Sequence, residues 1–295
     1  MPACILVSPV EAKPQNGAVP AIDRLRVVDI NDPHISVLDL GVTRGDGIFE
    51  VLGVIDGRPH GIEPHLRRLS KSAAMLDLPA LDLEAIEGAI HQAIELSEPV
   101  PERLVKIVVT RGIEGDGVAT CWVIALPSGG FESERTEGMS VAVLDRGYPH
   151  DIAARAPWLL AGAKTLSYAI NKAVLREAAR RGADDVLFVS SDGYVLEGPS
   201  STLIAKFGNR IWTPSTALGI LPGTTQDSVF KYLDSRGFAT AQGIFGRDLL
   251  LKADALWLTS SVRLLAPIRK LDDDVIPVDR ELTDDINAFL KARTS

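Results

Sequence analysis

The sequence predicts an α+β protein with two domains, a smaller N-terminal α/β domain and a larger C-terminal one. Its 295 residues are about twice the usual length of one domain. Strand and helix patterns alternate over residues 1–127, whereas residues 139–295 carry many short apolar runs and few helices, as in a barrel. The stretch 128–138 is rich in Ser, Gly and Glu and lacks apolar periodicity, so it is predicted to be the interdomain linker.

The first domain is predicted to contain a hairpin followed by two helices. The apolar run 47–55 ends in the dipeptide Asp56-Gly57, which is typical of a tight β-turn. Pro64 is tolerated in the first turn of a helix whose apolar residues 66, 69, 73 and 76 share one face. Apolar positions between 86 and 94 indicate the second helix.

Two more strands, over 103–110 and 120–126, are predicted to flank the Gly-rich turn 112–117. The N-terminal stretch 1–20 has a short apolar run with no Lys or Arg before it, so it does not fit a secretory signal. It is predicted to be an extension or an edge strand.

The second domain is predicted to begin with a strand over 139–144. A helix over 167–181 follows, with Ile170, Val174 and Ala178 on one face and Gly182 as its end. The runs 186–190 and 194–197 form a predicted hairpin across the turn dipeptide Asp192-Gly193. Further apolar runs predict strands at 202–207, 211–213 and 255–259.

Charge and cysteine content exclude several classes of protein. The 31 Lys and Arg residues against 39 Asp and Glu give a net charge of −8, which disfavours general binding to nucleic acid or to anionic membranes. Cys4 and Cys121 lack metal-ligand spacing, so neither a metal site nor a disulfide framework is expected. No apolar run reaches the roughly 18 residues of a membrane span. The expected location is the cytoplasm.

Lys164 is the first candidate for chemistry. It lies among small and apolar residues in LAGAKTL (160–166). Desolvation by such neighbours lowers the pKa of an amine and favours the neutral form that Schiff-base chemistry needs. The alternative is an ordinary lysine whose ammonium group reaches solvent.

Glu197 stands 33 residues later, at the end of the run 194–197 and before a Gly-Pro turn. A carboxylate in this place is suited to hold a pyridine nitrogen protonated, which makes a pyridoxal cofactor a stronger electron sink. The alternative is a solvated turn residue.

Two hydroxyl clusters are candidates for binding a phosphate. Thr224 and Thr225 precede a helix that starts near Asp227, and backbone N–H groups at a helix start attract anions. The run Thr259-Ser260-Ser261 follows an apolar strand, and Arg68 is a further candidate for a charge-assisted contact. A plain helix cap is the alternative for the threonine pair.

Five segments in order resemble the class IV aminotransferases, the pyridoxal 5′-phosphate (PLP) enzymes of fold type IV. The similarity extends from about residue 38 to 268. Its segments are GDGIFE (45–50), HLRRL (65–69), AKTLSY (163–168), DVLFVSSDGYVLEGPSSTL (185–203) and GILPGTTQDS (219–228). The resemblance implies a two-domain PLP enzyme whose larger C-terminal domain is a pseudo-barrel.

The resemblance also implies roles for individual residues. Lys164 is similar to the lysine that binds the cofactor covalently and then moves the substrate proton, and Glu197 to the carboxylate on the pyridine nitrogen. The residues similar to the family's phosphate ligands are Arg68, Thr224, Thr225 and Ser261. Tyr168 matches an aromatic position near the cofactor, and His65 a packing or capping position at a helix start. The resemblance gives Glu50 no role.

Within the family, the combination of RGDGIFE (44–50), the long run 163–203 and SSVRLLAPI (260–268) is most similar to the 4-amino-4-deoxychorismate lyases. It lacks the arginine that follows FEG in branched-chain enzymes and the Arg-x-His of the D-amino acid enzymes. It also has Val51 and Gly53 where lyases often have threonine and arginine. Arg111 and Arg263 are candidates for binding the substrate carboxylates.

The activity implied is elimination of pyruvate from 4-amino-4-deoxychorismate to give 4-aminobenzoate, a folate precursor. In this scheme the released Lys164 removes the C4 proton and the neighbouring enolpyruvyl group leaves. The alternatives are transamination of D-amino or branched-chain amino acids with the same Lys164 and Glu197, and a non-catalytic PLP carrier. The resemblance also implies a homodimer that acts on a small molecule.

Overall fold

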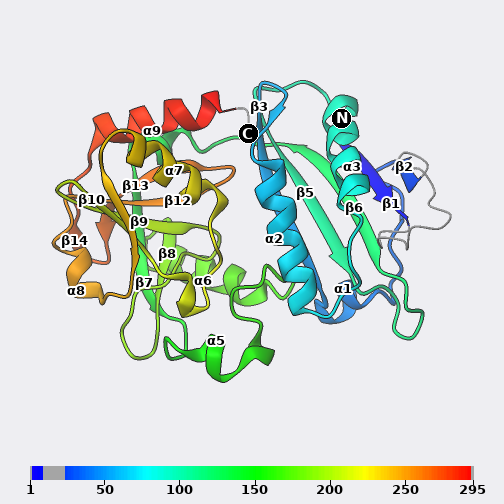
Figure 1. Ribbon diagram of the computed structural model, residues 1–295, viewed down its shortest axis with the longest axis horizontal. Coiled ribbons are helices and arrows are strands. Elements are labelled where there is room, and N and C mark those ends of the chain that lie inside the picture. The colour runs from blue at the N-terminus through cyan, green and yellow to red at the C-terminus, as the bar shows by residue number, and fades with distance from the viewer. Residues whose placement is uncertain (1, 9–23, 294–295) are drawn as a thin grey trace. The chain divides into compact units, whose positions relative to one another are not determined.

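The computed structural model describes residues 2–8 and 24–293, which divide into two compact units (Figure 1). Unit 1 contains the residues up to Gly129 together with Ala163–Tyr168, and unit 2 contains 130–162 and Ala169–Arg293. The boundary falls inside the predicted linker, but that stretch contains a short helix, α4 (Glu132–Thr136). The lysine-bearing segment 163–168, placed in the second domain by the sequence, instead pairs with a strand of unit 1.

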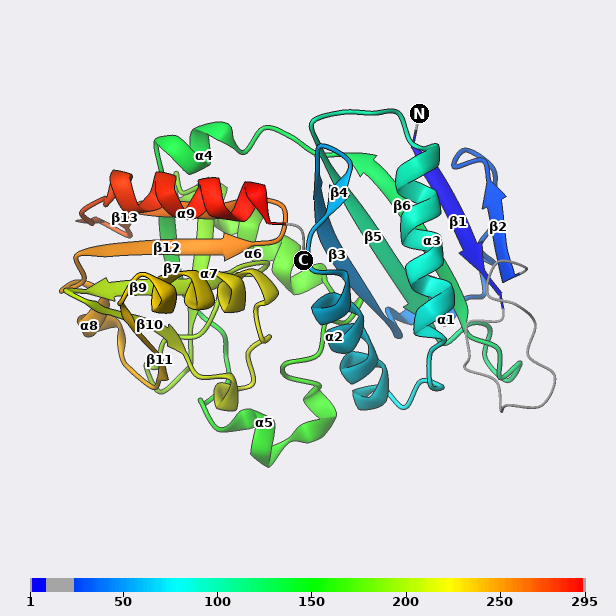
Figure 2. The ribbon, with the colours of Figure 1, turned by 45° about the horizontal axis from the view of Figure 1, so that its top comes forward.

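Unit 1 is built on an antiparallel sheet, six-stranded in the described residues, with the order β2-β1-β6-β5-β3-β4. The helices α2 and α3 lie along one face of this sheet (Figure 2). The elements are β1 (Ala3–Val7), β2 (Leu25–Val28), α1 (Leu40–Arg44), β3 (Gly47–Ile55), β4 (Arg58–Pro59), α2 (Ile62–Met75), α3 (Leu83–Leu96), β5 (Glu102–Thr110) and β6 (Thr120–Pro127).

The predicted hairpin of unit 1 forms because its turn residues tolerate positive φ. Asp56 and Gly57 have φ of 49° and 76°, as a two-residue type I′ turn requires. β3 enters this turn and β4 leaves it, and the two strands pair with Ile55 opposite Arg58. On its other side β3 pairs with β5 over its whole length, from Gly47 opposite Thr110 to Ile55 opposite Glu102.

The N-terminal strand is not the edge strand that the sequence predicts. β1 lies between β2 and β6 and pairs antiparallel with both, so β2 takes the edge position. The sequence offered no signal for this arrangement, because β1 pairs with β6, a segment far along the chain, with Ala3 opposite Ala125.

Unit 2 contains a mixed sheet, eight-stranded in the described residues, with the order β11-β10-β9-β12-β13-β7-β8 and β14 paired to β13. Besides α4, its helices are α5 (Ile152–Arg155), η2 (Pro157–Leu159), α6 (Ala169–Arg180), η3 (Thr216–Leu218), α7 (Thr224–Ser235), α8 (Arg247–Leu250) and α9 (Arg280–Ala292). Its strands are β7 (Met139–Asp145), β8 (Asp185–Val189), β9 (Thr202–Phe207), β10 (Arg210–Pro214), β11 (Ala239–Gly243), β12 (Ala255–Ser260), β13 (Leu264–Leu271) and β14 (Asp274–Val275).

The helix that follows the lysine segment ends where predicted but buries less of its apolar face. Gly182 has φ of 72° and follows the last turn of α6, which suits a residue without a side chain. Ala178 is fully buried and Val174 packs beside it, but Ile170 is 55% exposed. The first turn of α6 therefore does not reach the core, contrary to the predicted apolar face.

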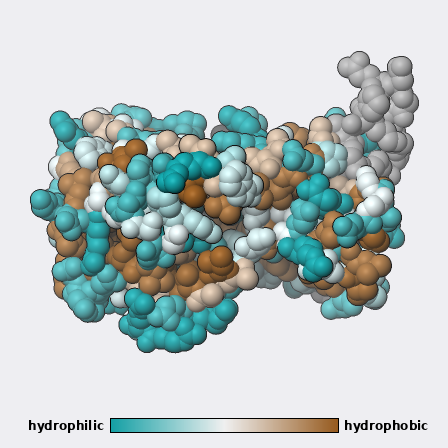
Figure 3. Space-filling model, turned by 90° about the horizontal axis from the view of Figure 1, so that it is seen from below, coloured by the Kyte–Doolittle hydropathy of each residue, from teal (hydrophilic) through white to brown (hydrophobic). Residues whose placement is uncertain are grey.

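The molecular surface mixes polar and apolar side chains, as Figure 3 shows for one face. The most exposed large apolar side chains in the described residues include Val37 and Leu38 of unit 1 and Trp158 of unit 2. Among the residues that the structure describes, no helix has the length and apolar character needed to cross a membrane.

Candidate active site

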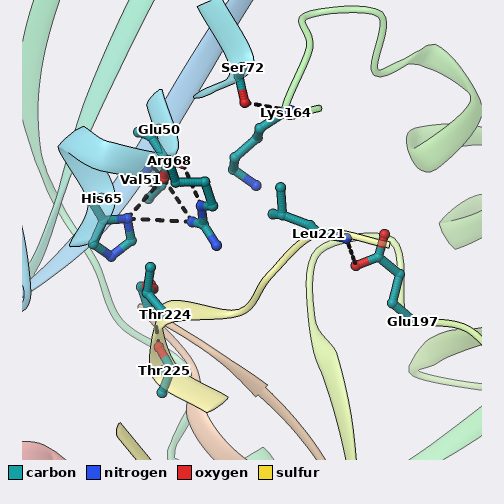
Figure 4. A network of polar contacts seen from close by, with 11 residues as sticks. Glu50, Val51, His65, Arg68, Ser72, Lys164, Glu197, Leu221, Thr224 and Thr225 are labelled. Atoms are coloured by element: carbon teal, nitrogen blue, oxygen red, sulfur yellow. Dashed lines mark hydrogen bonds and ion pairs between the residues drawn. The ribbon is translucent and has the colours of Figure 1, made fainter. Parts of the chain in front are cut away.

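Lys164 is held by its backbone against the edge of β3. Its N–H donates to Ser72 Oγ of α2 at 3.1 Å, and its carbonyl accepts from the N–H of Phe49 at 3.0 Å. The N–H of Leu166 donates to the Gly47 carbonyl at 2.8 Å, which extends this short strand-like pairing. Figure 4 shows the Lys164 side chain extending from the segment that Ser72 holds.

Gly47 permits this close approach because it has no side chain. A Cβ at this position would lie 2.6 Å from the Val109 carbonyl oxygen and 2.8 Å from Leu166 Cδ1. The second glycine of the GDG motif therefore leaves room for the backbone of β5 and for the Leu166 side chain of the lysine segment.

The ring of Phe49 faces the reactive end of Lys164. The lysine Nζ lies 4.6 Å from the ring centroid, and Tyr168 packs edge-on against the same ring at 5.4 Å. Phe49 is thus a common contact of Tyr168 and Lys164. The predicted place of Tyr168 near the cofactor stays a prediction.

A fully buried carboxylate, Glu50, organises the charges next to this segment. It accepts from Arg68 Nε at 2.6 Å and from Arg68 Nη2 at 2.8 Å, and His65 Nδ1 lies 2.8 Å from Oε2 (Figure 4). The pair fixes the plane of the Arg68 guanidinium, a group that presents its N–H donors in a rigid fork. An arginine held in this way presents an ordered set of donors to an anion.

Burial alone would raise the pKa of Glu50, but hydrogen bonds and charge from Arg68, assisted by His65, outweigh it and lower that pKa to about 2. The pKa of His65 is lowered, first by burial and further by the charges of Arg68 and Lys164, although Glu50 opposes the change. Glu50 is therefore ionised and His65 neutral at pH 7. His65 neither caps the helix nor simply packs, the two roles predicted, because its ring pairs with Glu50.

The hydroxyl residues of unit 2 come together at the start of α7. Thr224 Oγ1 and Thr225 Oγ1 each lie 3.4 Å from Ser261 Oγ, although 36 residues separate Thr225 from Ser261. The helix starts after Gly223 with no side-chain cap, so its first N–H groups are directed toward this point.

Glu197 lies in the same unit on the strand-like segment that follows β8. The Leu196 N–H donates to Phe188 and the Phe188 N–H to the Glu197 carbonyl, both at 2.9 Å, which forms the predicted hairpin pairing. The carboxylate accepts from the N–H of Leu221 at 3.2 Å (Figure 4). Glu197 is thus oriented by the loop that leads into the hydroxyl cluster, and it is not a solvated turn residue.

A family model described as amino-transferase class IV matches residues 47–271, more than half of the chain. The chain belongs to the class IV aminotransferase family. The resemblance seen in the sequence is confirmed.

Individual relatives span most of the chain. A bifunctional aminodeoxychorismate lyase and D-amino acid transaminase of Mycobacterium tuberculosis is 41% identical over 255 residues, 83% of this chain and 88% of that one. A fold IV transaminase of Curtobacterium pusillum superposes with a TM-score of 0.94 at 46% identity, and each chain is fully covered. A hypothetical aminotransferase of M. tuberculosis in its PLP-bound form has a TM-score of 0.88 at 35% identity and covers 98% of this chain and 99% of its own.

These comparisons confirm the predicted fold type IV and the predicted cofactor, because class IV aminotransferases depend on PLP. The described residues fit such a group. A start of α7 lined by three hydroxyls suits a phosphate. Within unit 2 the Glu197 carboxylate suits a ring nitrogen, and within unit 1 Lys164 carries an amine of the kind that such a cofactor binds.

The two arginines proposed for the substrate carboxylates bind carboxylates of the protein itself. Arg111 donates to Asp46 through Nε at 2.7 Å and to the Leu76 carbonyl at 2.6 Å. Arg263 donates to the buried Asp185 at 2.7 Å. Their ion pairs connect elements within unit 1 and within unit 2, so the geometry favours structural roles over the predicted substrate binding.

Sequence reasoning missed Glu50, Phe49 and Ser72 as parts of the lysine cluster. Phe49 and Glu50 are neighbours in the GDGIFE segment. Because neighbouring residues of a strand face opposite sides of the sheet, this alternation was the signal that could have drawn attention to them. Ser72 carried no signal, because its contact with Lys164 joins residues 92 positions apart.

Gly223→Ala is expected to weaken PLP binding about tenfold, because a displaced helix start no longer directs its N–H groups at the phosphate. A Cβ at this position would collide with Thr202 Oγ1 and lie 3.1 Å from Gln226 Cβ. Absorbance titration of the cofactor-free protein with PLP measures the dissociation constant. Gly129→Ala, at an exposed glycine with no atom near the added Cβ, is the control. Equal affinities of both variants would contradict the assignment.

Proposed function

We propose that the protein is a PLP-dependent 4-amino-4-deoxychorismate lyase that releases pyruvate and forms 4-aminobenzoate. The observation that carries the proposal is the placement of Lys164, fixed by backbone hydrogen bonds to β3 and α2 with its amine beside Phe49. A proton-transferring amine requires such rigid support. The choice of substrate is supported by the M. tuberculosis relative, whose name includes this lyase activity.

In this proposal each cluster has a separate task. Thr224, Thr225, Ser261 and Arg68 bind the phosphate, and Glu197 keeps the pyridine nitrogen protonated. When bound, PLP withdraws electrons from the carbon that carries the substrate amine and so acidifies its C–H bond.

Lys164 then acts as the base. Its Nζ takes the C4 proton, the electron pair of that C–H bond completes the ring, and the bond to the enolpyruvyl oxygen breaks. The departing enolate takes up a proton and becomes pyruvate. The aromatic product makes the elimination effectively irreversible.

Transamination of D-amino acids is the second candidate, because the same relative's name includes it. A related M. tuberculosis protein, 38% identical over 89% of this chain, is described in an alpha-ketoglutarate-bound form. We therefore propose 2-oxoglutarate as the amine acceptor of this second reaction. Lys164 would move the proton in both reactions, so both follow from one site.

The two activities are separated by product. Holoenzyme is supplied with enzymatically generated 4-amino-4-deoxychorismate, and 4-aminobenzoate is followed by its fluorescence. In parallel, D-alanine or D-glutamate is supplied with a 2-oxo acid, and the new amino acid is measured. Formation of 4-aminobenzoate supports the lyase. Transamination without 4-aminobenzoate would overturn it in favour of the second candidate, and neither product would overturn both.

We also propose that the protein forms a homodimer and works in the cytoplasm, as the family resemblance implies. Large apolar side chains such as Val37, 81% exposed, and Trp158, 74% exposed, are of the kind that association buries. Sedimentation equilibrium of the full chain tests the dimer: a single species of 31.7 kDa would contradict it.

A further inference from the structure

Ser261 lies on the turn 260–264, which joins β12 to β13 in unit 2. Ser260 opposes Leu264 across this turn, and Leu264 has φ of 66°. This left-handed conformation costs free energy in leucine, and it persists only where neighbouring contacts impose it. Leu264 is 1% exposed, so the packed interior of the unit surrounds the strained residue. The backbone that presents Ser261 is therefore under strain.

The side chain of Arg135 holds the backbone of this turn. Its Nε donates to the Arg263 carbonyl at 2.8 Å, and its Nη2 donates to the Val262 carbonyl at 3.0 Å. Arg135 is 4% exposed and belongs to α4, within the stretch that the sequence predicts to be a linker. One buried guanidinium thus fixes the carbonyls of the two residues that follow Ser261, and the second of these carbonyls belongs to the peptide bond that leads into Leu264.

Two other side chains of unit 2 hold the flanks of the turn. Asn287 of α9 donates from Nδ2 to the Leu265 carbonyl at 2.9 Å, and its Oδ1 accepts from the Leu265 N–H at 3.0 Å. The Arg263 side chain donates to the buried Asp185 at 2.7 Å. Of these three side chains, Arg135 is the one that holds backbone groups inside the turn.

We propose that Arg135 is a positioning residue for the phosphate group of PLP, because it holds the strained turn where Ser261 meets the threonine pair of α7. The proposal rests on the phosphate role of Ser261 in the proposed function. Ser261 Oγ lies 3.4 Å from Thr224 Oγ1 and from Thr225 Oγ1, which is long for a hydrogen bond between hydroxyls. The backbone of the turn therefore has a large part in setting where Ser261 lies.

Such a hydroxyl is sensitive to small movements of its backbone. A hydrogen bond from a hydroxyl to an anionic oxygen spans about 2.5–2.7 Å, so a displaced turn lengthens and weakens it. Without the two hydrogen bonds from Arg135, the turn is free to relax the strain at Leu264 and to move Ser261 with it.

The test measures cofactor binding in Arg135→Gln, with PLP and with pyridoxal, which lacks the phosphate. Absorbance titration of the cofactor-free protein gives both dissociation constants. We expect the dissociation constant for PLP to rise about 10-fold, the effect of weakening one hydrogen bond to a charged group. The constant for pyridoxal should change less than about threefold, because the contact proposed for Ser261 is with the phosphate.

A double-mutant cycle shows whether Arg135 acts through Ser261. Ser261→Ala alone should raise the dissociation constant for PLP about 10-fold. The double variant, Arg135→Gln with Ser261→Ala, should raise it little more than either change alone, because both changes remove the same contact. A merely structural role of Arg135 predicts instead that the two losses multiply to about 100-fold.

Two further variants separate positioning from loss of stability. Arg103→Gln removes a 5% exposed arginine of unit 1 that likewise donates to a backbone carbonyl, that of Ile94 at 2.9 Å. It should lower the melting temperature as Arg135→Gln does and leave both dissociation constants unchanged. Arg135→Lys keeps the charge but loses the paired donors, so it should weaken PLP binding about threefold and leave pyridoxal binding unchanged. This variant carries the comparison if Arg135→Gln does not fold.

Three results would overturn the proposal. The first is unchanged PLP affinity in the Arg135 variants while Ser261→Ala loses affinity. The second is an equal loss of affinity for PLP and for pyridoxal, and the third is a pair of losses that multiply in the cycle. Unchanged affinity in Ser261→Ala would refute the phosphate role and the proposal together. None of these measurements needs turnover, so a holoenzyme that forms no 4-aminobenzoate would refute the proposed lyase alone.

Discussion

Lys164→Ala is expected to lower lyase and transaminase rates by at least about 10⁴-fold. In the proposed function the lysine combines covalent attachment with proton transfer, and proton transfer by a positioned group alone accounts for about 10²- to 10⁴-fold. The fold should persist, because Lys164 meets β3 and α2 through its backbone N–H and carbonyl, which alanine also has. Steady-state assays of 4-aminobenzoate formation measure the loss.

A chemical readout accompanies this kinetic one. Borohydride reduction of the holoenzyme should fix the cofactor on the peptide that contains Lys164, and mass spectrometry identifies that peptide. The matched control is Lys252→Ala, which removes an exposed lysine and should keep both the rate and the modified peptide. Modification of another lysine in the wild-type protein would refute the assignment.

The second large effect is on stability. Glu50→Gln is expected to destabilise unit 1 by about 3–5 kcal/mol, because it leaves the Arg68 guanidinium buried without its counter-charge. Both side chains are largely shielded, with 0% of Glu50 and 9% of Arg68 exposed. Denaturant unfolding at pH 7 measures the change. Glu63→Gln, which breaks the exposed pair with Arg67, should cost less than about 1 kcal/mol. Similar losses in both variants would contradict a special role for Glu50.

The same cluster predicts how stability depends on pH. The pKa of Glu50 falls from 4.5 to about 2 on folding, so its contribution is complete above pH 4.5 and is lost as the pH falls toward 2. The lowered pKa of His65 acts in the same direction, since the unfolded chain takes up a proton below pH 6.5 and the buried ring resists it. Unfolding curves at pH 7, 5 and 4 should show stability declining, with a shallower decline in Glu50→Gln. Parallel curves for both proteins would contradict this linkage.

Local patterns in the sequence were enough to predict most elements of the fold. The hairpin at Asp56-Gly57 and the end of α6 at Gly182 depend on residues that tolerate positive φ, a property of the residue itself. The position of β1 inside its sheet and the docking of Lys164 on β3 depend on pairing between distant segments. No local pattern encodes such pairing.

The candidate site shows the same division. Lys164, Glu197 and the threonine pair could be singled out because their motifs resemble a family. Glu50 could not, since its importance comes from burial beside Arg68 and His65, which only the packing of α2 on β3 creates. Arg111 was predicted to bind a substrate carboxylate because no local pattern revealed its actual partner, Asp46, which lies 65 residues away in the sequence.

Because residues 163–168 dock on β3, unit 1 is completed only after this later segment has been synthesised. Unit 1 lacks this final segment until the ribosome has added about 40 residues beyond Gly129, roughly 2 to 8 s at usual rates of elongation. During that interval the Gly47 carbonyl and the Phe49 N–H lack the partners that the segment later provides. An open strand edge of this kind favours pairing with other chains. The stretch that delivers the reactive lysine therefore also closes a sheet edge, and a nascent chain truncated before it would be inactive and prone to aggregate.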